Sequence, residues 1–313
     1  MDLITVGITC FNAEDTIERA VRSAQAQTWR PLEIVVVDDS STDESWKILE
    51  RLADEDERIH LIGHSENRGV GAARNSVLEH ASGVFVAFFD DDDISQPERL
   101  AEQYRRIVEY EIETGEGKVV CYTATDQSYP DGETRYSPTL GMDSTPAPAG
   151  ESVARLILLG TPVAGGAGAC PTSSQMARRG LYESVGGFDG GFRRHEDTDL
   201  NLRLALAGAH FVGLSKPLVG QTVTITGDKS VAEDRRYALR LIEKHGELLR
   251  TWKWYEFSRR WTEMKYSMLE AGTVKALPHI IGLFFRSPLK LARKTAWALP
   301  NRKSYKRYRY PHD

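Results

Sequence analysis

Four consecutive aspartates, Asp90-Asp91-Asp92-Asp93, are the residues of this sequence best suited to bind a metal ion. They directly follow an apolar run at 84–89 that has the composition of a buried strand. Carboxylates packed this closely repel one another, and a divalent cation relieves the repulsion. Hard oxygen ligands suit Mg2+ or Mn2+, which keep positions open for phosphate oxygens. The alternative is a solvated acidic turn before the next helix, but the position at a strand end favours a metal site.

A second pair of carboxylates, Asp38-Asp39, ends the apolar run at 32–37 in the same way. A carboxylate here can accept hydrogen bonds from a nucleobase N–H or a ribose hydroxyl. The alternative is a helix start, with Ser41 as the N-cap residue. By itself this pair is compatible with both interpretations.

The segment 67–75 combines small residues with arginines and lies between a predicted strand and a helix. Small residues allow a ligand to approach the backbone, and arginine pairs well with phosphate. The alternative is a turn followed by a helix packed tightly on the sheet.

A second acidic group, at 195–199, follows the glycine-containing segment 186–189. Its acids lie at a predicted helix start, where backbone N–H groups and the helix dipole favour negative charge. Capping is therefore one interpretation of Asp197 and Asp199. The functional interpretation is a general base that faces the aspartates at 90–93.

Strands and helices alternate four times before about residue 110. The polar groups in this part of the chain lie where a predicted strand is followed by a predicted helix. The predicted strands are 3–10, 32–37, 58–62 and 84–89, and the predicted helices are 15–25, 41–52, 71–80 and 97–109. This alternation predicts right-handed βαβ units and a mainly parallel sheet flanked by helices. Ligands bind beyond the carboxyl ends of such strands, which is where the acidic pairs lie.

The regularity weakens after residue 110. Residues 125–150 are predicted to form loops with a hairpin, and helices are expected at 153–159, 198–207 and 232–250. We expect a catalytic domain at 1–225, divided into a nucleotide-binding half at 1–110 and an acceptor half at 111–225. A helical, basic extension would occupy 226–313.

Composition indicates a globular protein of the cytoplasm. The three cysteines are widely spaced and suit neither a disulfide framework nor a metal site. The N-terminus lacks the features of a signal peptide, and no apolar run predicts a membrane span. The net charge of −5 divides unevenly, because residues 271–313 carry +9 and the preceding part −14. A basic tail on an acidic body predicts an anionic partner.

Six motifs in order resemble the inverting family 2 glycosyltransferases of GT-A fold. They are the segments 5–12, 37–43, 67–75, 89–93, 186–189 and Glu196-Asp197. Each motif is modest, but their order and spacing over about residues 3–208 make the match specific.

The resemblance implies a role for each matched residue. Asp197 would be the catalytic base with Glu196 beside it, and Asp92 would hold Mn2+ or Mg2+. The segment 186–188 would form part of the donor-sugar and acceptor site. The residues that would bind the nucleotide sugar are Thr9, Asn12, Glu14, Asp38, Asp39, Arg74, Asp90 and Asp91.

Two regions depart from the family pattern. Cys10 and Phe11 replace a small residue and a tyrosine, which both look tolerable. The loop at 221–230 lacks the histidine that helps to hold the metal in many relatives, so a second protein ligand from this loop is in doubt. Lys229 is instead a candidate for a diphosphate contact.

The predicted activity is a metal-dependent inverting transfer of a hexosyl or hexosaminyl group from a nucleoside diphosphate sugar, with UDP favoured, to a hydroxyl. The expected acceptor is a glycan or a lipid-linked molecule of bacterial surface polysaccharide or glycolipid assembly, and no nucleic acid is expected to bind. The alternatives are a sugar-phosphate nucleotidyltransferase, which would prefer an N-terminal glycine-rich loop, and a non-catalytic nucleotide-binding module.

The basic tail predicts one of two partners. Pro288 and Pro300 bound a helix at 288–299, on which Lys290, Arg293 and Lys294 share a side beside apolar residues. This is the composition of an interfacial helix, which would hold the enzyme peripherally on the inner face of the cell membrane. The alternative is that the helix packs on the protein's own acidic body.

Overall fold

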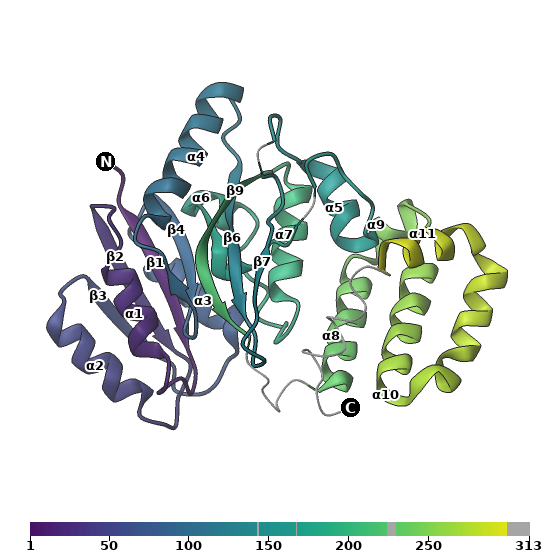
Figure 1. Cartoon of the computed structure of the whole chain (residues 1–313), viewed down its shortest axis with the longest axis horizontal. Coiled ribbons are helices and arrows are strands. Elements are labelled where there is room, and N and C mark those ends of the chain that lie inside the picture. The colour runs from purple at the N-terminus through teal and green to yellow at the C-terminus, as the bar shows by residue number, and fades with distance from the viewer. Residues whose placement is uncertain (143, 167, 224–229, 299–313) are drawn as a thin grey trace. The chain divides into compact units, whose positions relative to one another are not determined.

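The computed structural model describes residues 1–142, 144–166, 168–223 and 230–298 (Figure 1). The chain divides into two compact units, Met1–Val223 and Thr224–Asp313. The first unit mixes strands and helices, and the described part of the second is helical. Both features agree with the fold class predicted from the sequence.

Within the described residues, one sheet of nine strands forms the centre of the first unit, in the order β3-β2-β1-β4-β8-β6-β9-β5 with β7 beside β6. The strands are β1 (Ile4–Cys10), β2 (Leu32–Asp38), β3 (Ile59–Gly63), β4 (Phe85–Asp90), β5 (Ile94–Ser95), β6 (Val119–Ser128), β7 (Thr134–Ser137), β8 (Gln175–Arg178) and β9 (His210–Thr222). Six strands run in one direction, namely β1, β2, β3, β4, β6 and β9. The other direction is taken by β5, β7 and β8. The prediction of a mainly parallel sheet is confirmed.

Helices cover both faces of this sheet. In the first unit they are α1 (Ile17–Gln25), α2 (Ser45–Glu55), α3 (Val70–His80), α4 (Arg99–Thr114), α5 (Gly150–Leu159), α6 (Arg179–Ser184) and α7 (Glu196–Leu206). Apolar residues of α1, α2 and α4 pack in the main core with Ile4, Ile8 and Val36. Because side chains alternate between the faces of a strand, Gly7 faces the opposite side, where it meets α3.

The strands in the middle of the sheet differ in the length over which they pair with their neighbours. β1 and β2 are buried at every position, which agrees with their largely apolar sequences. β8 is much shorter, and it pairs with β4 only over 85–87 against 176–178. The far side of β8 pairs equally briefly with β6. A narrow antiparallel seam therefore joins the two parts of the sheet.

The second unit contains α8 (Val231–Lys244), α9 (Gly246–Thr251), α10 (Tyr255–Arg286) and α11 (Pro288–Ala298). The single helix predicted at 232–250 is thus two helices that meet at His245. The helix predicted at 288–299 is confirmed to Ala298, while Leu299, Lys229 and the basic residues beyond 299 lie outside the described residues.

A break divides α10 at Ala271 and Gly272, whose φ angles are −145° and 76°. By length and composition α10 is the one described helix that could cross a membrane. The two straight parts, 255–270 and 273–286, are each shorter than the roughly 20 residues that a spanning helix needs. The break therefore argues against a transmembrane α10.

We predict that Gly7→Ala destabilises the fold by about 1–3 kcal/mol, which is typical of an overpacked core. A Cβ at this position would lie 2.3 Å from Cγ1 of Val77 on α3. Urea unfolding measures the change. The double variant with Val77→Ala should recover part of the loss, and purely additive effects would contradict the proposed clash.

Candidate active site

The carboxyl ends of three neighbouring strands bring the predicted polar residues to one edge of the sheet. In the strand register, Cys10 lies opposite Asp38, and Thr9 lies opposite Asp90. Thr9 is almost fully buried in β1, and Asp38 is buried at the end of β2. Residues that are about 80 positions apart in the sequence therefore converge because their strands are parallel neighbours.

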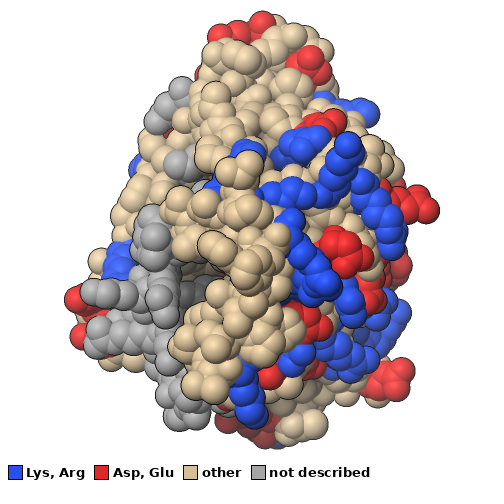
Figure 2. All heavy atoms as spheres, turned by 90° about the vertical axis from the view of Figure 1, so that its right-hand side faces the viewer, with Lys and Arg blue, Asp and Glu red and all other residues tan. Residues whose placement is uncertain are grey.

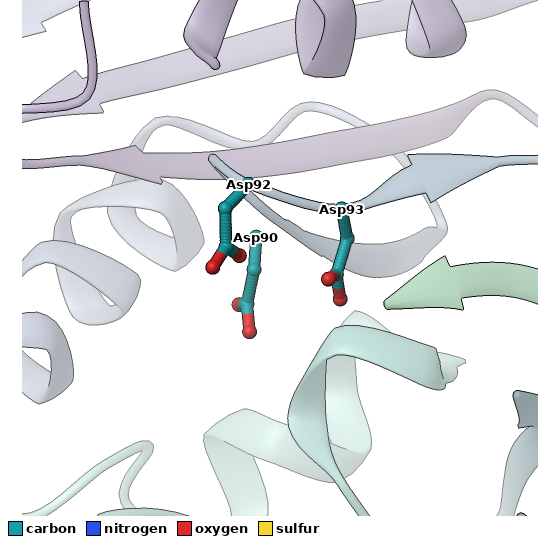
Figure 3. A group of neighbouring side chains, drawn as sticks. All are labelled: Asp90, Asp92 and Asp93. Atoms are coloured by element: carbon teal, nitrogen blue, oxygen red, sulfur yellow. The ribbon is translucent and has the colours of Figure 1, made fainter. Parts of the chain in front are cut away.

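Three of the four consecutive aspartates form a cluster that fits a metal ion. One carboxylate oxygen from each of Asp90, Asp92 and Asp93 lies within 4.8 Å of the others. Figure 3 shows the three side chains projecting to the same side of the chain where β4 ends. Asp91 takes another direction, because its Oδ2 accepts a hydrogen bond from the backbone N–H of Phe11 at 3.1 Å. The sequence had singled out Asp92 for the metal and had not singled out Asp93.

Burial and mutual repulsion disfavour the charged forms of these carboxylates. Burial, followed by Asp90 and Asp92, raises the pKa of Asp93 to about 8. Burial, Asp92 and Asp90 raise the pKa of Asp91 to about 7. A bound divalent cation would lower these pKa values again. The donors are all oxygen atoms, which suit Mg2+ or Mn2+.

Two side chains that the sequence analysis missed support this cluster. The Gln221 side chain, from the end of β9, donates to Ser173 Oγ at 2.9 Å and lies 3.4 Å from Asp93 Oδ2. Arg99 is fully buried and donates to the backbone oxygen of Phe88 at 2.9 Å. Burial lowers the pKa of Arg99 to about 9, although Asp93 and Asp90 act in the opposite direction. Neither residue belongs to the acidic run, so no local pattern indicates them.

Arg74, on α3, joins the aspartate cluster to the second acidic group. Its Nη2 lies 3.0 Å from Asp90 Oδ1, and its Nη1 lies 2.9 Å from Glu196 Oε1. Its guanidinium also lies over the ring of Phe188, 5.5 Å from the ring centre. Burial would lower the pKa of Arg74, but Asp90 and Glu196 outweigh it and the pKa lies above its ordinary value. Arg74 is therefore a permanently charged bridge.

Glu196 and Asp197 begin α7 and have different surroundings. Burial and the neighbouring Asp197 raise the pKa of Glu196 to about 7, with Arg74 acting in the opposite direction. Asp197 Oδ1 accepts hydrogen bonds from the N–H of Thr198 at 2.6 Å and from its hydroxyl at 3.1 Å. Glu196 is thus held by its ion pair with Arg74. The hydrogen bonds described for Asp197 are to the next residue of the same helix start.

Asp39 and Asp38 hold the loops around them. Asp39 accepts from the N–H groups of Arg68 at 2.9 Å and Gly69 at 2.7 Å, and it contacts His64 Nδ1 at 2.7 Å. Asp38 accepts from Ser41 N at 2.9 Å and Ser41 Oγ at 2.5 Å. Ser41 is not the helix N-cap expected from the sequence, because α2 begins later and is preceded by Glu44.

Asn12 and Glu14 tie the loop after β1 to the loop after β2. Asn12 Oδ1 accepts from the N–H of Thr42 at 2.8 Å, and Glu14 Oε2 accepts from the N–H of Glu44 at 2.9 Å. These contacts fix the loops that would border a nucleotide. In the described structure their side chains bind protein backbone.

Asn75 connects two of the sequence motifs. Its side chain donates to the backbone oxygen of Phe188 and accepts from the N–H of Phe188, both at 2.8 Å. The preceding Gly187 has φ 63°, and a Cβ there would lie 2.6 Å from Asn75 Oδ1. The glycine lets the loop at 186–189 approach α3, which brings Phe188 over Arg74.

Comparison with known proteins gives a family match for the N-terminal part of the chain. Residues 5–148 match the profile described as Glycosyl transferase family 2. The UDP-Glc:alpha-D-GlcNAc-diphosphoundecaprenol beta-1,3-glucosyltransferase WfaP of Escherichia coli is 38% identical over 103 residues, which are 33% of this chain and 40% of that protein. The matches span less than half the length of such curated relatives.

Two solved structures resemble nearly the whole chain. S. aureus TarS 1–349 in complex with UDP has a TM-score of 0.55 at 20% identity, covering 97% of this chain and 90% of that one. The mannosyltransferase PcManGT from Pyrobaculum calidifontis in complex with GDP-Man and Mn2+ has a TM-score of 0.60 at 17% identity, covering 98% and 84%. At these identities the likeness establishes a shared fold, which agrees with the GT-A-like fold expected from the sequence.

We predict that Arg74→Met lowers the free energy of unfolding by about 3 kcal/mol, because it leaves Asp90 and the mostly buried Glu196 without their cation. Urea unfolding measures the loss. Arg193→Met is the matched control, since Arg193 is exposed and should change stability by less than about 0.5 kcal/mol. Equal stability of the two variants would contradict the bridge.

We also predict that Mn2+ binds more tightly as pH rises from about 6 to about 9, with release of protons. The pKa of Asp93 rises from 3.8 to about 8 on folding, so the metal-free folded protein holds a proton that the unfolded chain has lost. The free energy of unfolding of the metal-free protein should therefore fall as pH rises from 3.8 to about 8.

Titration calorimetry in two buffers of different ionisation enthalpy measures the proton release, and thermal unfolding measures the stabilisation by Mn2+. Asp93→Asn should bind Mn2+ weakly and lose most of the pH dependence. An affinity for Mn2+ that is the same at both ends of the pH range would refute the assignment.

Proposed function

We propose that this protein, whose residues 5–148 match the profile of glycosyl transferase family 2, is a metal-dependent, inverting glycosyltransferase. It moves a sugar from a nucleoside diphosphate, with UDP favoured, to an acceptor hydroxyl. One observation carries the proposal: Arg74 links the Asp90 carboxylate of a metal-binding cluster to Glu196, which is adjacent to a candidate base. Arg74 thus connects the cluster that would neutralise a leaving diphosphate to the segment that carries the candidate base.

The metal would be held by Asp90, Asp92 and Asp93, whose oxygens already lie close enough to share one ion. When bound, Mg2+ or Mn2+ neutralises charge on the diphosphate that leaves. Arg74 adds a fixed positive charge near the same place, and this charge needs no reorganisation during the reaction. The Pyrobaculum calidifontis mannosyltransferase, which shares this fold, is in complex with Mn2+, and this supports the choice of ion.

Asp197 would act as the general base. It would take the proton of the acceptor hydroxyl while that oxygen bonds to the anomeric carbon and the bond to the diphosphate oxygen breaks, which inverts the configuration. In the hydrogen bonds described above, its carboxylate accepts from the N–H and the hydroxyl of the adjacent Thr198. Glu196 is paired with Arg74, so we assign it to the positioning of that arginine.

The donor would be bound at the edge formed by β1, β2 and β4. Thr9, Asp38 and Asp39 line the ends of these strands, and Asn12 and Glu14 fix the loops beside them. The name of the Escherichia coli relative specifies UDP-Glc and an undecaprenol-linked acceptor. This relative supports a UDP-sugar donor and a lipid-linked acceptor. With such an acceptor, the protein would act at the inner face of the cell membrane in surface polysaccharide assembly.

A screen of radiolabelled sugar nucleotides, with and without Mn2+, tests the function. We expect metal-dependent release of the nucleoside diphosphate, with transfer when a suitable lipid-linked acceptor is added. Synthesis of a sugar nucleotide from a sugar phosphate and a nucleoside triphosphate would instead indicate a nucleotidyltransferase. Binding of nucleotides with no turnover of any donor would indicate a binding module.

We predict that Asp197→Asn keeps its affinity for UDP and Mn2+ but lowers kcat for transfer by about 10²–10⁴-fold, because an amide does not accept the proton. The helix start should survive, since asparagine is also a good residue for a helix N-terminus. Calorimetry with UDP and a transfer assay measure the two properties separately. Normal transfer by Asp197→Asn together with inactive Glu196→Gln would show that Glu196 is the base.

A further inference from the structure

The second part of α10 carries a stripe of exposed apolar side chains. In the order of the chain they are Val274, Leu277, Ile281, Phe284 and Phe285, and Leu289 follows at the start of α11. Val274, Phe285 and Leu289 are 83%, 78% and 85% exposed. Within α10 the spacings of three and four residues bring them to one side of the helix.

This stripe is separate from the face that holds the helix in the second unit. Ala276 and Leu283 are buried, and they pack in a cluster with Phe257 and Met264 of the first part of α10. Ile280 and Leu291 are partly buried against the same cluster. The helix therefore satisfies its packing with one apolar face and exposes a second, which the packing within this unit does not explain.

The exposed stripe lies in a strongly basic part of the chain. From 271 to 312 the sequence contains no aspartate or glutamate, and Lys275, Arg286 and Arg293 are exposed on α10 and α11. Figure 2 shows an area of uncharged residues on this side of the molecule, next to many Lys and Arg with some Asp and Glu among them. Apolar side chains bordered by cations are complementary to an anionic, amphipathic partner.

Not every basic residue predicted for this surface contributes to it. Lys290 donates to the backbone oxygen of Lys253 and lies over the Trp254 ring. Burial, followed by Lys265, lowers the pKa of Lys294 to about 8. The apolar part of the surface is thus mainly on α10, whereas the sequence had indicated the helix at 288–299, with the segment 280–285 just upstream as additional apolar area.

We propose that this surface, formed by 274–289 with Lys275, Arg286 and Arg293, binds the anionic surface of a lipid bilayer. The break at Ala271 and Gly272 leaves a helix of 273–286, which is too short to span the bilayer but long enough to lie in its interface. The apolar stripe enters the acyl region, and the cations contact lipid phosphates. Association of two copies through this stripe would bring their cations together, so a lipid surface is the better match.

Sedimentation of the full chain with vesicles of phosphatidylcholine, with and without phosphatidylglycerol, tests the proposal. We expect binding that requires phosphatidylglycerol and weakens at high salt. Phe284→Asp with Phe285→Asp should lower the partition coefficient by about tenfold or more. Neutralisation of Lys275 or Arg286 to glutamine should lower it by about fivefold for each residue.

Ile112→Asp is the matched control, because Ile112 is 80% exposed on α4, which belongs to the first unit. It should bind vesicles like the unchanged protein. UDP binding by every variant checks that the fold survives, and it keeps this test separate from that of the proposed enzymatic function. Two results would overturn the proposal: equal vesicle binding by the Phe284→Asp/Phe285→Asp variant, or a concentration-dependent dimer that this variant abolishes without any vesicle binding by the unchanged protein.

Discussion

The ion pairs of one buried arginine hold the two acidic regions of this protein together. Arg74 contacts Asp90 at the end of β4 and Glu196 at the start of α7, residues that are more than 100 positions apart. A buried guanidinium is costly unless its donors are paired, so both carboxylates must be in position for the fold to be stable. The adjacent Asn75 holds the loop that carries Phe188. One turn of α3 thereby positions the candidate base relative to the aspartate cluster.

The electrostatics of the site follow from this arrangement. Arg74 compensates Asp90 and Glu196, while the buried Arg99 supplies positive charge on the Asp93 side of the cluster. Despite these two cations, burial followed by the charges of Asp90 and Asp92 raises the pKa of Asp93. A divalent ion would complete the neutralisation, and a phosphate group could then approach a site that repels anions without it.

The sequence predicted the N-terminal strands well because their physical signal is local. β1, β2 and β4 are buried on both faces and are largely apolar in sequence, and acids follow at the ends of β2 and β4. The hairpin expected within 125–150 is present where β6 pairs with β7. β8, β9 and the first part of β6 were not predicted, since β8 is short and β9 contains a register shift against β6. Asp39 and Glu14 were recognised as polar residues near the site, but their backbone partners depend on loops from other elements. Gln221 and Arg99 act through contacts across the fold that no spacing reveals.

The short seam at β8 has a consequence for how the proposed enzyme can diversify. Only 85–87 of β4 pair with β8, so few backbone hydrogen bonds join the N-terminal strands to β6 and β9. Substitutions downstream of this seam can remodel the surface for a new acceptor without altering the register of β1, β2 and β4. The N-terminal strands can then be inherited as one module. A recombinant joined at the seam would need a β8 that pairs with 85–87 of β4 and a carboxylate that pairs with Arg74.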